Sequence, residues 1–96
     1  MLNQEVINAF GLRVKRLRED KKISQEELSF QTGFHRTYIG MVERGERNIS
    51  LSNIAVFAKV FGINIADLLD LEKVKSDLSF TKYELKSEKA KSITND

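Results

Sequence analysis

Apolar residues recur at helical spacing near the N-terminus of the chain. Four large ones are separated by four, four and three positions: Val6, Phe10, Val14 and Leu17. This spacing places them on one face of an α-helix, with mostly polar residues elsewhere. The pattern predicts a first helix that Asn3 can cap and that runs to about Lys21. Gly11 falls in its middle, where glycine costs about 1 kcal/mol relative to alanine, and a close helix contact would account for it.

A second helix follows, and a turn separates it from a third. Ser24 is a suitable N-cap, and Glu27 three residues later completes a capping box. Leu28 is the first apolar anchor of this helix, and Ile23 is expected to pack near it as a hydrophobic staple. Thr32-Gly33 then interrupts the pattern, as a turn that needs a flexible backbone would.

The third helix is predicted to run from Arg36 to Arg44, with Gly45 closing it at the C′ position. At about 100° per residue, one side carries groups that can pack on a core: Tyr38, Ile39 and Val42. The other side carries Arg36, Thr37, Gly40, Met41 and Arg44. This second side combines hydrogen-bond donors with a small and a flexible apolar residue, which suits reading the edge of a base pair.

Two more helices are predicted in the second half of the chain. Ser50 is a suitable N-cap for a helix from Leu51 to Phe61, which Gly62 closes. Its broad apolar stripe consists of Ile54, Phe57, Ala58 and Phe61. Asn64 can cap a fifth helix, which contains Ile65, Leu68 and Leu69.

Beyond Asp70 the helical stripe continues with Leu71, Val74 and Leu78, so we expect the fifth helix to extend to about Asp77. From Lys86 onward the residues are small, polar and charged, which predicts a frayed or disordered tail. No segment alternates apolar and polar residues as a strand would. The sequence therefore predicts an all-α fold of five helices, with one domain over residues 1–70 and a C-terminal helical extension and tail over residues 71–96.

Composition narrows the function. Ninety-six residues with 41% apolar content suit one folded domain with a modest core. The chain has no Cys and one His, which argues against a disulfide framework, a thiolate nucleophile or a metal site. No apolar run approaches the roughly 20 residues of a membrane span, and the N-terminus does not resemble a signal peptide. We expect a cytoplasmic protein without metal, cofactor, small-molecule ligand or membrane contact.

Charge supports nucleic-acid binding only through its distribution. The net charge is +2, from 16 basic and 14 acidic residues, so any DNA-binding surface must be a local patch. Between His35 and Asn48, three arginines stand against two glutamates: Arg36, Arg44 and Arg47 against Glu43 and Glu46.

The stretch SQEELSFQTGFHRTYIGMVERGER, residues 24–47, resembles the helix-turn-helix of phage-repressor-type (XRE/Cro-like) regulators. It is particularly similar to the controller proteins of restriction–modification systems, through Arg36-Thr37-Tyr38-Ile39, Glu43-Arg44 and Arg47-Asn48. The resemblance covers roughly Phe10 to Leu69. It implies a repressor-like, sequence-specific transcriptional regulator. Such a protein binds double-stranded DNA at a pseudo-palindromic operator as a homodimer, and in the controller family one protein often both activates and represses its own operon.

The resemblance also assigns roles to individual residues. The residues expected to touch base edges are Arg36, Thr37 and Met41. Those expected at the DNA backbone are Gln25, Tyr38, Arg44, Arg47 and Asn48. For Tyr38 two alternatives remain open, a hydroxyl that reaches a phosphate and a ring that belongs only to the core.

Three further positions are interpreted through the same resemblance. Glu43 is expected to form an ion pair with Arg18 and so to orient the first and third helices. Lys22 stands where the family usually has glycine, so a left-handed backbone there would cost about 1–2 kcal/mol. His35 precedes the recognition helix, where it is either a helix-start residue or, when protonated, a phosphate contact.

The fifth helix and its flanks carry more apolar groups than one short helix can bury in its own domain: Ile63, Ile65, Leu68, Leu69 and Leu71. We expect these residues to form the dimer interface. The alternative function is a protein-binding module, such as an antitoxin that uses residues 71–96 to wrap a partner. An enzyme has almost no support, because no catalytic constellation or Gly-rich phosphate loop is present, and Asp67 and Asp70 are expected to be solvated carboxylates.

Overall fold

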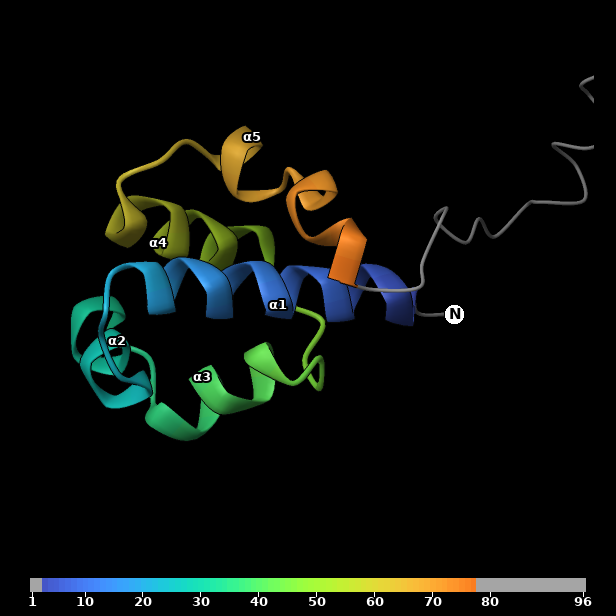
Figure 1. Cartoon of the computed structure of the whole chain (residues 1–96). Coiled ribbons are helices and arrows are strands. Elements are labelled where there is room, and N and C mark those ends of the chain that lie inside the picture. Colours follow the sequence, from blue (N-terminus) through green and yellow to red (C-terminus); the bar gives the residue numbers. More distant parts are fainter. Residues whose placement is uncertain (1–2, 78–96) are drawn as a thin grey trace, which may run out of the picture.

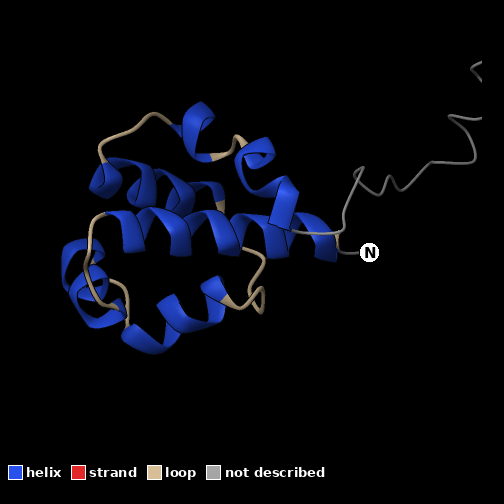
Figure 2. Cartoon of the chain, viewed as in Figure 1, coloured by secondary structure: helices blue, strands red, loops and turns tan. Residues whose placement is uncertain are grey.

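The computed structural model describes residues 3–77. Its helices are α1 (Gln4–Asp20), α2 (Gln25–Thr32), α3 (Arg36–Glu43), α4 (Leu51–Phe61) and α5 (Ile65–Leu68), followed by a 3-10 segment, η1 (Leu71–Asp77) (Figure 1). Within this range the chain forms helices and loops and no strand (Figure 2). The predicted all-α fold of five helices is therefore confirmed. None of the described helices is both long and apolar enough to span a membrane.

Helix α1 is the central element, with α3 on one side of it and α4 and α5 on the other (Figure 1). The core along α1 is formed by residues of every helix: Ala9, Phe10, Val14, Leu28, Ile39, Val42, Phe57, Ala58, Leu68, Leu71 and Val74. Leu12, Leu17 and Ile23 pack against this cluster without being fully buried. The apolar spacing that predicted these helices therefore also identified their buried faces.

Side-chain caps begin three helices as predicted. The N–H of Glu27 donates to Ser24 Oγ at 3.0 Å, that of Asn53 to Ser50 Oγ at 3.1 Å, and that of Asp67 to Asn64 Oδ1 at 2.7 Å. The capping box is only half formed, because the Glu27 carboxylate accepts a hydrogen bond from Gln31 instead. Asn3 is at the N-cap position of α1, but the predicted side-chain cap is wrong, because the Asn3 side chain makes no cap hydrogen bond. The backbone carbonyl of Asn3 accepts hydrogen bonds from the N–H groups of Val6 and Ile7.

Two unusual backbone positions set the path into and through the helix-turn-helix. Lys22 has a φ of 61°, so it adopts the left-handed conformation that disfavours a side chain, at a cost of about 1–2 kcal/mol. Gly33 ends α2 with a φ of 80°, as the predicted turn required. Thr32 supports that turn, since its hydroxyl donates to the carbonyl of Leu28 and accepts from the N–H of Phe34.

The backbones of α1 and α3 approach each other closely at Gly11. A Cβ at this position would lie 2.3 Å from the carbonyl oxygen of Val42 and 2.9 Å from that of Glu43. The glycine that weakens α1 locally thus lets the C-terminal end of α3 pack directly on the α1 backbone.

The fifth helix is shorter than predicted. It ends at Leu68, and η1 follows as a separate 3-10 segment, so the expected extension of α5 to Asp77 is wrong. Leu68, Leu71 and Val74 are all buried in the core of the domain. The chain turns at Leu69 and Asp70, which lets both segments cover the core instead of running past α1 as one straight rod. Leu78 and the predicted tail lie outside the described residues.

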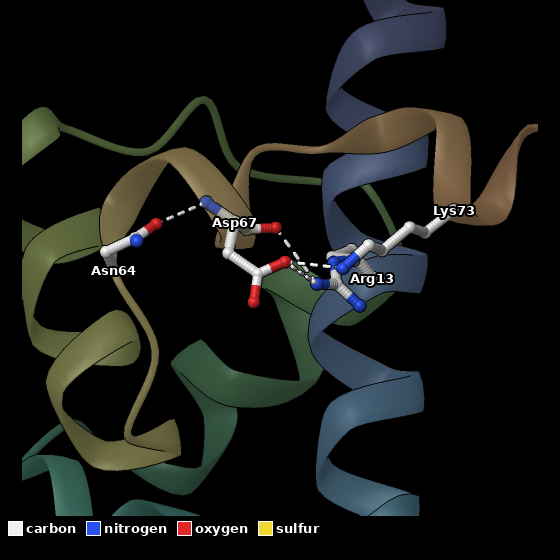
Figure 3. Close-up of polar contacts among 4 residues, drawn as sticks. All are labelled: Arg13, Asn64, Asp67 and Lys73. Carbon is white, nitrogen blue, oxygen red and sulfur yellow. Dashed lines mark hydrogen bonds and ion pairs between the residues drawn. The ribbon is translucent and has the colours of Figure 1, made fainter.

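Asp67 holds this turn through the contacts drawn in Figure 3. The Arg13 guanidinium, from α1, donates to the Asp67 carbonyl at 2.9 Å and to Oδ1 at 3.2 Å. Lys73, from η1, donates to the same Oδ1 at 2.5 Å. The hydrogen bond from Lys73, together with the charges of Lys73 and Arg13, lowers the pKa of the Asp67 carboxyl. The expectation that Asp67 is a merely solvated carboxylate is wrong, because it joins α1, α5 and η1.

Candidate nucleic-acid interface

Helix α3 lies with the predicted rotation for its apolar side. Ile39 and Val42 are buried, and Tyr38 is half-buried. On the opposite side Arg36, Thr37 and Arg44 are exposed and Met41 is half-buried. Two exposed polar side chains from the first turn of α3, Arg36 and Thr37, are thus available to a base edge.

Gly40 differs from that expectation, because it is buried although it belongs to the polar side of α3. A Cβ built there would lie 3.0 Å from Arg44 Nη1 and 3.7 Å from Gln25 Oε1. The side chains of Arg44 and Gln25 therefore cross over Gly40. A glycine at this position lets these two predicted DNA-backbone residues lie flat against α3.

Arg18, Gln25 and Glu43 form a polar network that joins α1, α2 and α3. The predicted pair is present: Arg18 Nε lies 2.7 Å from Glu43 Oε2, and Nη2 lies 3.1 Å from Oε1. Gln25 Nε2 donates to the same Oε1 at 3.0 Å, and Arg18 Nη1 donates to the carbonyl of Ile23 at 2.9 Å. The hydrogen bond with Glu43 raises the pKa of the Arg18 guanidinium.

This network was only partly visible in the sequence. The Glu43 side chain is 3% exposed, so its negative charge is neutralised by Arg18 and shielded from any phosphate nearby. The link from Gln25 to Glu43 was missed, because Gln25 was considered only as a phosphate contact. One of its amide hydrogens is committed to Glu43, which fixes the orientation of the amide.

Tyr38, in the first turn of α3, contacts Arg47, in the loop after the helix. The Arg47 guanidinium is 5.6 Å from the centroid of the Tyr38 ring, a cation–π arrangement, and that ring packs edge-on against Phe34 at 5.1 Å. Asn53 Nδ2 donates to the Tyr38 hydroxyl at 3.0 Å. Tyr38 therefore has a half-buried ring and a hydroxyl that is already a hydrogen-bond acceptor.

A polar depression lies beside Tyr38. Its lining includes Tyr38, Arg47, Asn48, Ser50 and Asn53. Asn53 was not identified from the sequence, because only the cap at the start of α4 was considered there. The spacing between Ser50 and Asn53 gives no sign that the Asn53 side chain reaches Tyr38.

Arg44 is exposed and forms an ion pair with Glu46 at 2.8 Å, so part of the charge of Arg44 is neutralised locally.

His35 begins α3. Its Nδ1 accepts the N–H of Thr37 at 3.0 Å, which makes the imidazole the N-cap of the helix. Among the described residues no group of three or more His, Cys, Asp or Glu side chains is arranged to hold a metal ion.

The predicted dimer residues are divided by the structure. Leu68 is 0% exposed in the single chain, so it is not available to a partner, and assigning it to the interface was wrong; Leu71 is 5% exposed and reaches the surface only as part of the wall of an apolar groove. Ile65 and Leu69 are 37% and 39% exposed, and Ile63 is half-buried. Leu51, at the start of α4, was missed and is 68% exposed. A mainly apolar groove beside Leu69 is lined by Val6, Ile7, Phe10, Ile49, Ile54 and Leu71, with Arg47 and Asn48 at its edge.

A family model described as helix-turn-helix matches residues 14–68, more than half of the chain. This range contains the C-terminal part of α1, α2, the turn at Gly33, α3, α4 and α5. The chain belongs to the helix-turn-helix family.

Controller proteins of restriction–modification systems are among its relatives in that family. The control protein C.BamHI of Bacillus amyloliquefaciens is 46% identical over 66 residues, which cover 68% of this chain and 82% of the relative. The crystal structure of the restriction–modification controller protein C.AhdI from Aeromonas hydrophila superposes with a TM-score of 0.62 at 45% identity, covering 65% of this chain and 94% of the other. The resemblance inferred from Arg36-Thr37-Tyr38-Ile39 is thereby confirmed.

A third similar structure is that of the controller protein C.Esp1396I, crystallised as a tetramer in complex with its natural 35 base-pair operator. It has a TM-score of 0.65 and 25% identity, and the match covers 71% of this chain and 91% of that one.

Proposed function

We propose that this protein is a transcriptional regulator of the controller type, which binds a pseudo-palindromic DNA operator as a homodimer. The observation that carries the proposal is the rotation of α3, which buries Ile39 and Val42 and leaves Arg36 and Thr37 exposed on a helix-turn-helix. The operator-bound controller protein among the similar structures supports the same reading. Such a regulator acts where its operator is, which we take to be the cytoplasm.

In this proposal α3 enters the major groove and reads base edges through Arg36, Thr37 and Met41. An arginine can donate two hydrogen bonds to O6 and N7 of guanine, while Met41 offers only apolar contact, for example to a thymine methyl. Thr37 can either donate to a base or place its own methyl against thymine. Base contacts from these residues supply the sequence preference.

Backbone contacts hold the helix in register. Gln25 begins α2, and its remaining amide hydrogen and the N-terminal end of the helix suit a phosphate. Arg44 lies at the C-terminal end of α3 beside Gln25, and Arg47 and Asn48 lie in the following loop, so these residues would hold the DNA backbone together with the N-terminus of α2. Arg47 stacks on Tyr38, and this stacking restricts the guanidinium before DNA arrives. Preordering of this kind lowers the entropy cost of the contact.

The homodimer would use the apolar surface that the single chain leaves exposed. Leu51, Ile65 and Leu69 are exposed large apolar residues, and Leu69 borders the groove that Val6, Ile7 and Phe10 line. An isologous two-fold contact lets the same residues on both copies fill one another's grooves. It would place two α3 helices at half-sites about 34 Å apart on one face of the duplex. Occupancy of such an operator then activates or represses according to its position relative to the promoter.

The alternative of a protein-binding module gains no support from the described residues. Leu71 and Val74, at the start of the segment assigned to partner binding, are buried in the core of the domain. That alternative would have to rest on residues 78–96, which lie outside the described range.

Selection of bound DNA from a random pool by the purified full-length protein tests the proposed function. We expect a consensus with two-fold symmetry whose half-sites are one helical turn apart. Recovery of DNA without any shared sequence would contradict the proposal, and a single asymmetric site would contradict the homodimer.

A further inference from the structure

His35 is the only histidine of the chain, and it lies immediately before the recognition helix. Its backbone is extended, with φ −66° and ψ 144°, and its side chain is exposed. Nδ1 accepts a hydrogen bond from the N–H of Thr37 at 3.0 Å. The residue therefore caps α3 with a ring nitrogen, whereas the usual N-cap side chains of Ser, Thr, Asp and Asn use an oxygen.

This hydrogen bond determines where the imidazole carries its proton. A nitrogen that accepts a hydrogen bond cannot itself be protonated, so the neutral ring that caps α3 has its hydrogen on Nε2. Nε2 lies on the side of the ring away from the capped N–H. His35 thus presents a hydrogen-bond donor to its exterior, next to Arg36 and Thr37 in the chain.

We propose that His35 is a DNA-contacting residue with two simultaneous functions: Nδ1 caps α3, and Nε2–H donates to a hydrogen-bond acceptor on the DNA. This inference rests on the proposed function, because it requires α3 to enter the groove. The acceptor is either a phosphate oxygen or the edge of a base near the one that Arg36 reads. Both present the same chemistry to an N–H donor.

Two substitutions separate the cap from the contact. In His35→Asn the amide oxygen takes the place of Nδ1 and preserves the cap, but the side chain stops short of the Nε2 position. In His35→Gln the amide nitrogen can reach the Nε2 position, but no acceptor remains at the place of Nδ1. The first variant therefore removes the donor alone, and the second removes the cap alone.

We expect His35→Asn to melt within about 2 °C of the wild type, since asparagine is a good N-cap. Its affinity for the selected operator should fall about 3- to 10-fold per half-site, the equivalent of one lost hydrogen bond. His35→Gln should melt about 4–8 °C lower, because it loses a cap. Measured where it is fully folded, it should recover most of the affinity that the asparagine variant loses.

Titrations against the operator and a scrambled duplex identify the acceptor. An equal loss on both DNAs assigns a phosphate oxygen, and a loss confined to the operator assigns a base edge. An asparagine variant that binds both DNAs as well as the wild type, or a glutamine variant that loses as much affinity, would overturn the inference.

Arg36→Ala, titrated in parallel, separates this inference from the proposed function. If the wild type shows no preference for any sequence, the proposed function fails, and the inference about His35 fails with it. If Arg36→Ala weakens operator binding and His35→Asn does not, only the contact by His35 is refuted.

Discussion

For Gly11→Ala, helix propensity predicts a gain in the free energy of unfolding, and packing predicts a loss. Alanine in the middle of α1 would gain about 1 kcal/mol from helix propensity. Its methyl group, however, would lie 2.3 Å from the carbonyl oxygen of Val42 and 2.9 Å from that of Glu43. Both are backbone atoms at the end of α3, so no side chain can move aside, and the two helices must separate.

Overpacking of this kind costs about 1–3 kcal/mol, and the fixed backbone on both sides places this case at the upper end. After the gain in propensity is subtracted, we expect a net destabilisation of about 2 kcal/mol. For a domain of this size it corresponds to a melting temperature about 8–16 °C lower. Thermal and urea unfolding followed by circular dichroism measure both quantities.

An exposed position in the same helix provides the control. Lys15 is exposed on α1, so the difference between Lys15→Gly and Lys15→Ala measures the glycine-to-alanine gain without any clash. If Gly11→Ala stabilises the protein by that same amount, α1 and α3 are not in close contact. The placement of the recognition helix would then be wrong.

Three other predictions concern the core, the dimer and the turn after α5. Ile39→Ala should destabilise the protein by about 2–5 kcal/mol, because Ile39 is fully buried, and an unchanged denaturation midpoint would show that α3 is rotated differently. Leu69→Glu should shift the protein towards monomer in sedimentation at micromolar concentration, with little change in melting temperature. Leu68→Glu should instead unfold the protein. A Leu69→Glu variant that sediments like the wild type would exclude Leu69 from the interface. The ion pairs of Asp67 lower its pKa, so the stability they contribute is present above the unfolded-state value of about 3.9 and is lost as the pH falls through the folded-state value. The free energy of unfolding of Asp67→Asn should therefore fall less steeply than that of the wild type as the pH is lowered. Two parallel plots of unfolding free energy against pH would refute this prediction.

The sequence predicted the elements whose signals are local. The caps at Ser24, Ser50 and Asn64 and the turn at Gly33 follow from chemistry within a few residues. The buried face of α1 follows from spacing alone, and the Arg18–Glu43 pair followed from the family resemblance.

What the sequence missed depends on contacts between distant segments. Periodicity shows that Leu68 and Leu71 are apolar, but not whether their own domain or a partner covers them. The turn at Leu69 rests on Arg13, which is 54 residues from Asp67 in the chain. In the interface, Tyr38 contacts Arg47 and Asn53 because the loop after α3 folds back towards the first turn of that helix. The spacing of residues in the sequence does not predict the path of this loop.

The central claim is that α3 reads DNA sequence through Arg36 while residues such as Arg47 hold the backbone. Titration of Arg36→Ala and Arg47→Ala against operator and scrambled DNA at several salt concentrations tests it most directly. Arg36→Ala should lose about 1–3 kcal/mol per half-site on the operator and much less on scrambled DNA. Arg47→Ala should weaken binding to both DNAs and reduce the slope of log affinity against log salt by roughly one per subunit. If Arg36→Ala binds the operator as tightly as the wild type and retains its sequence preference, Arg36 does not read the operator, and the claim fails.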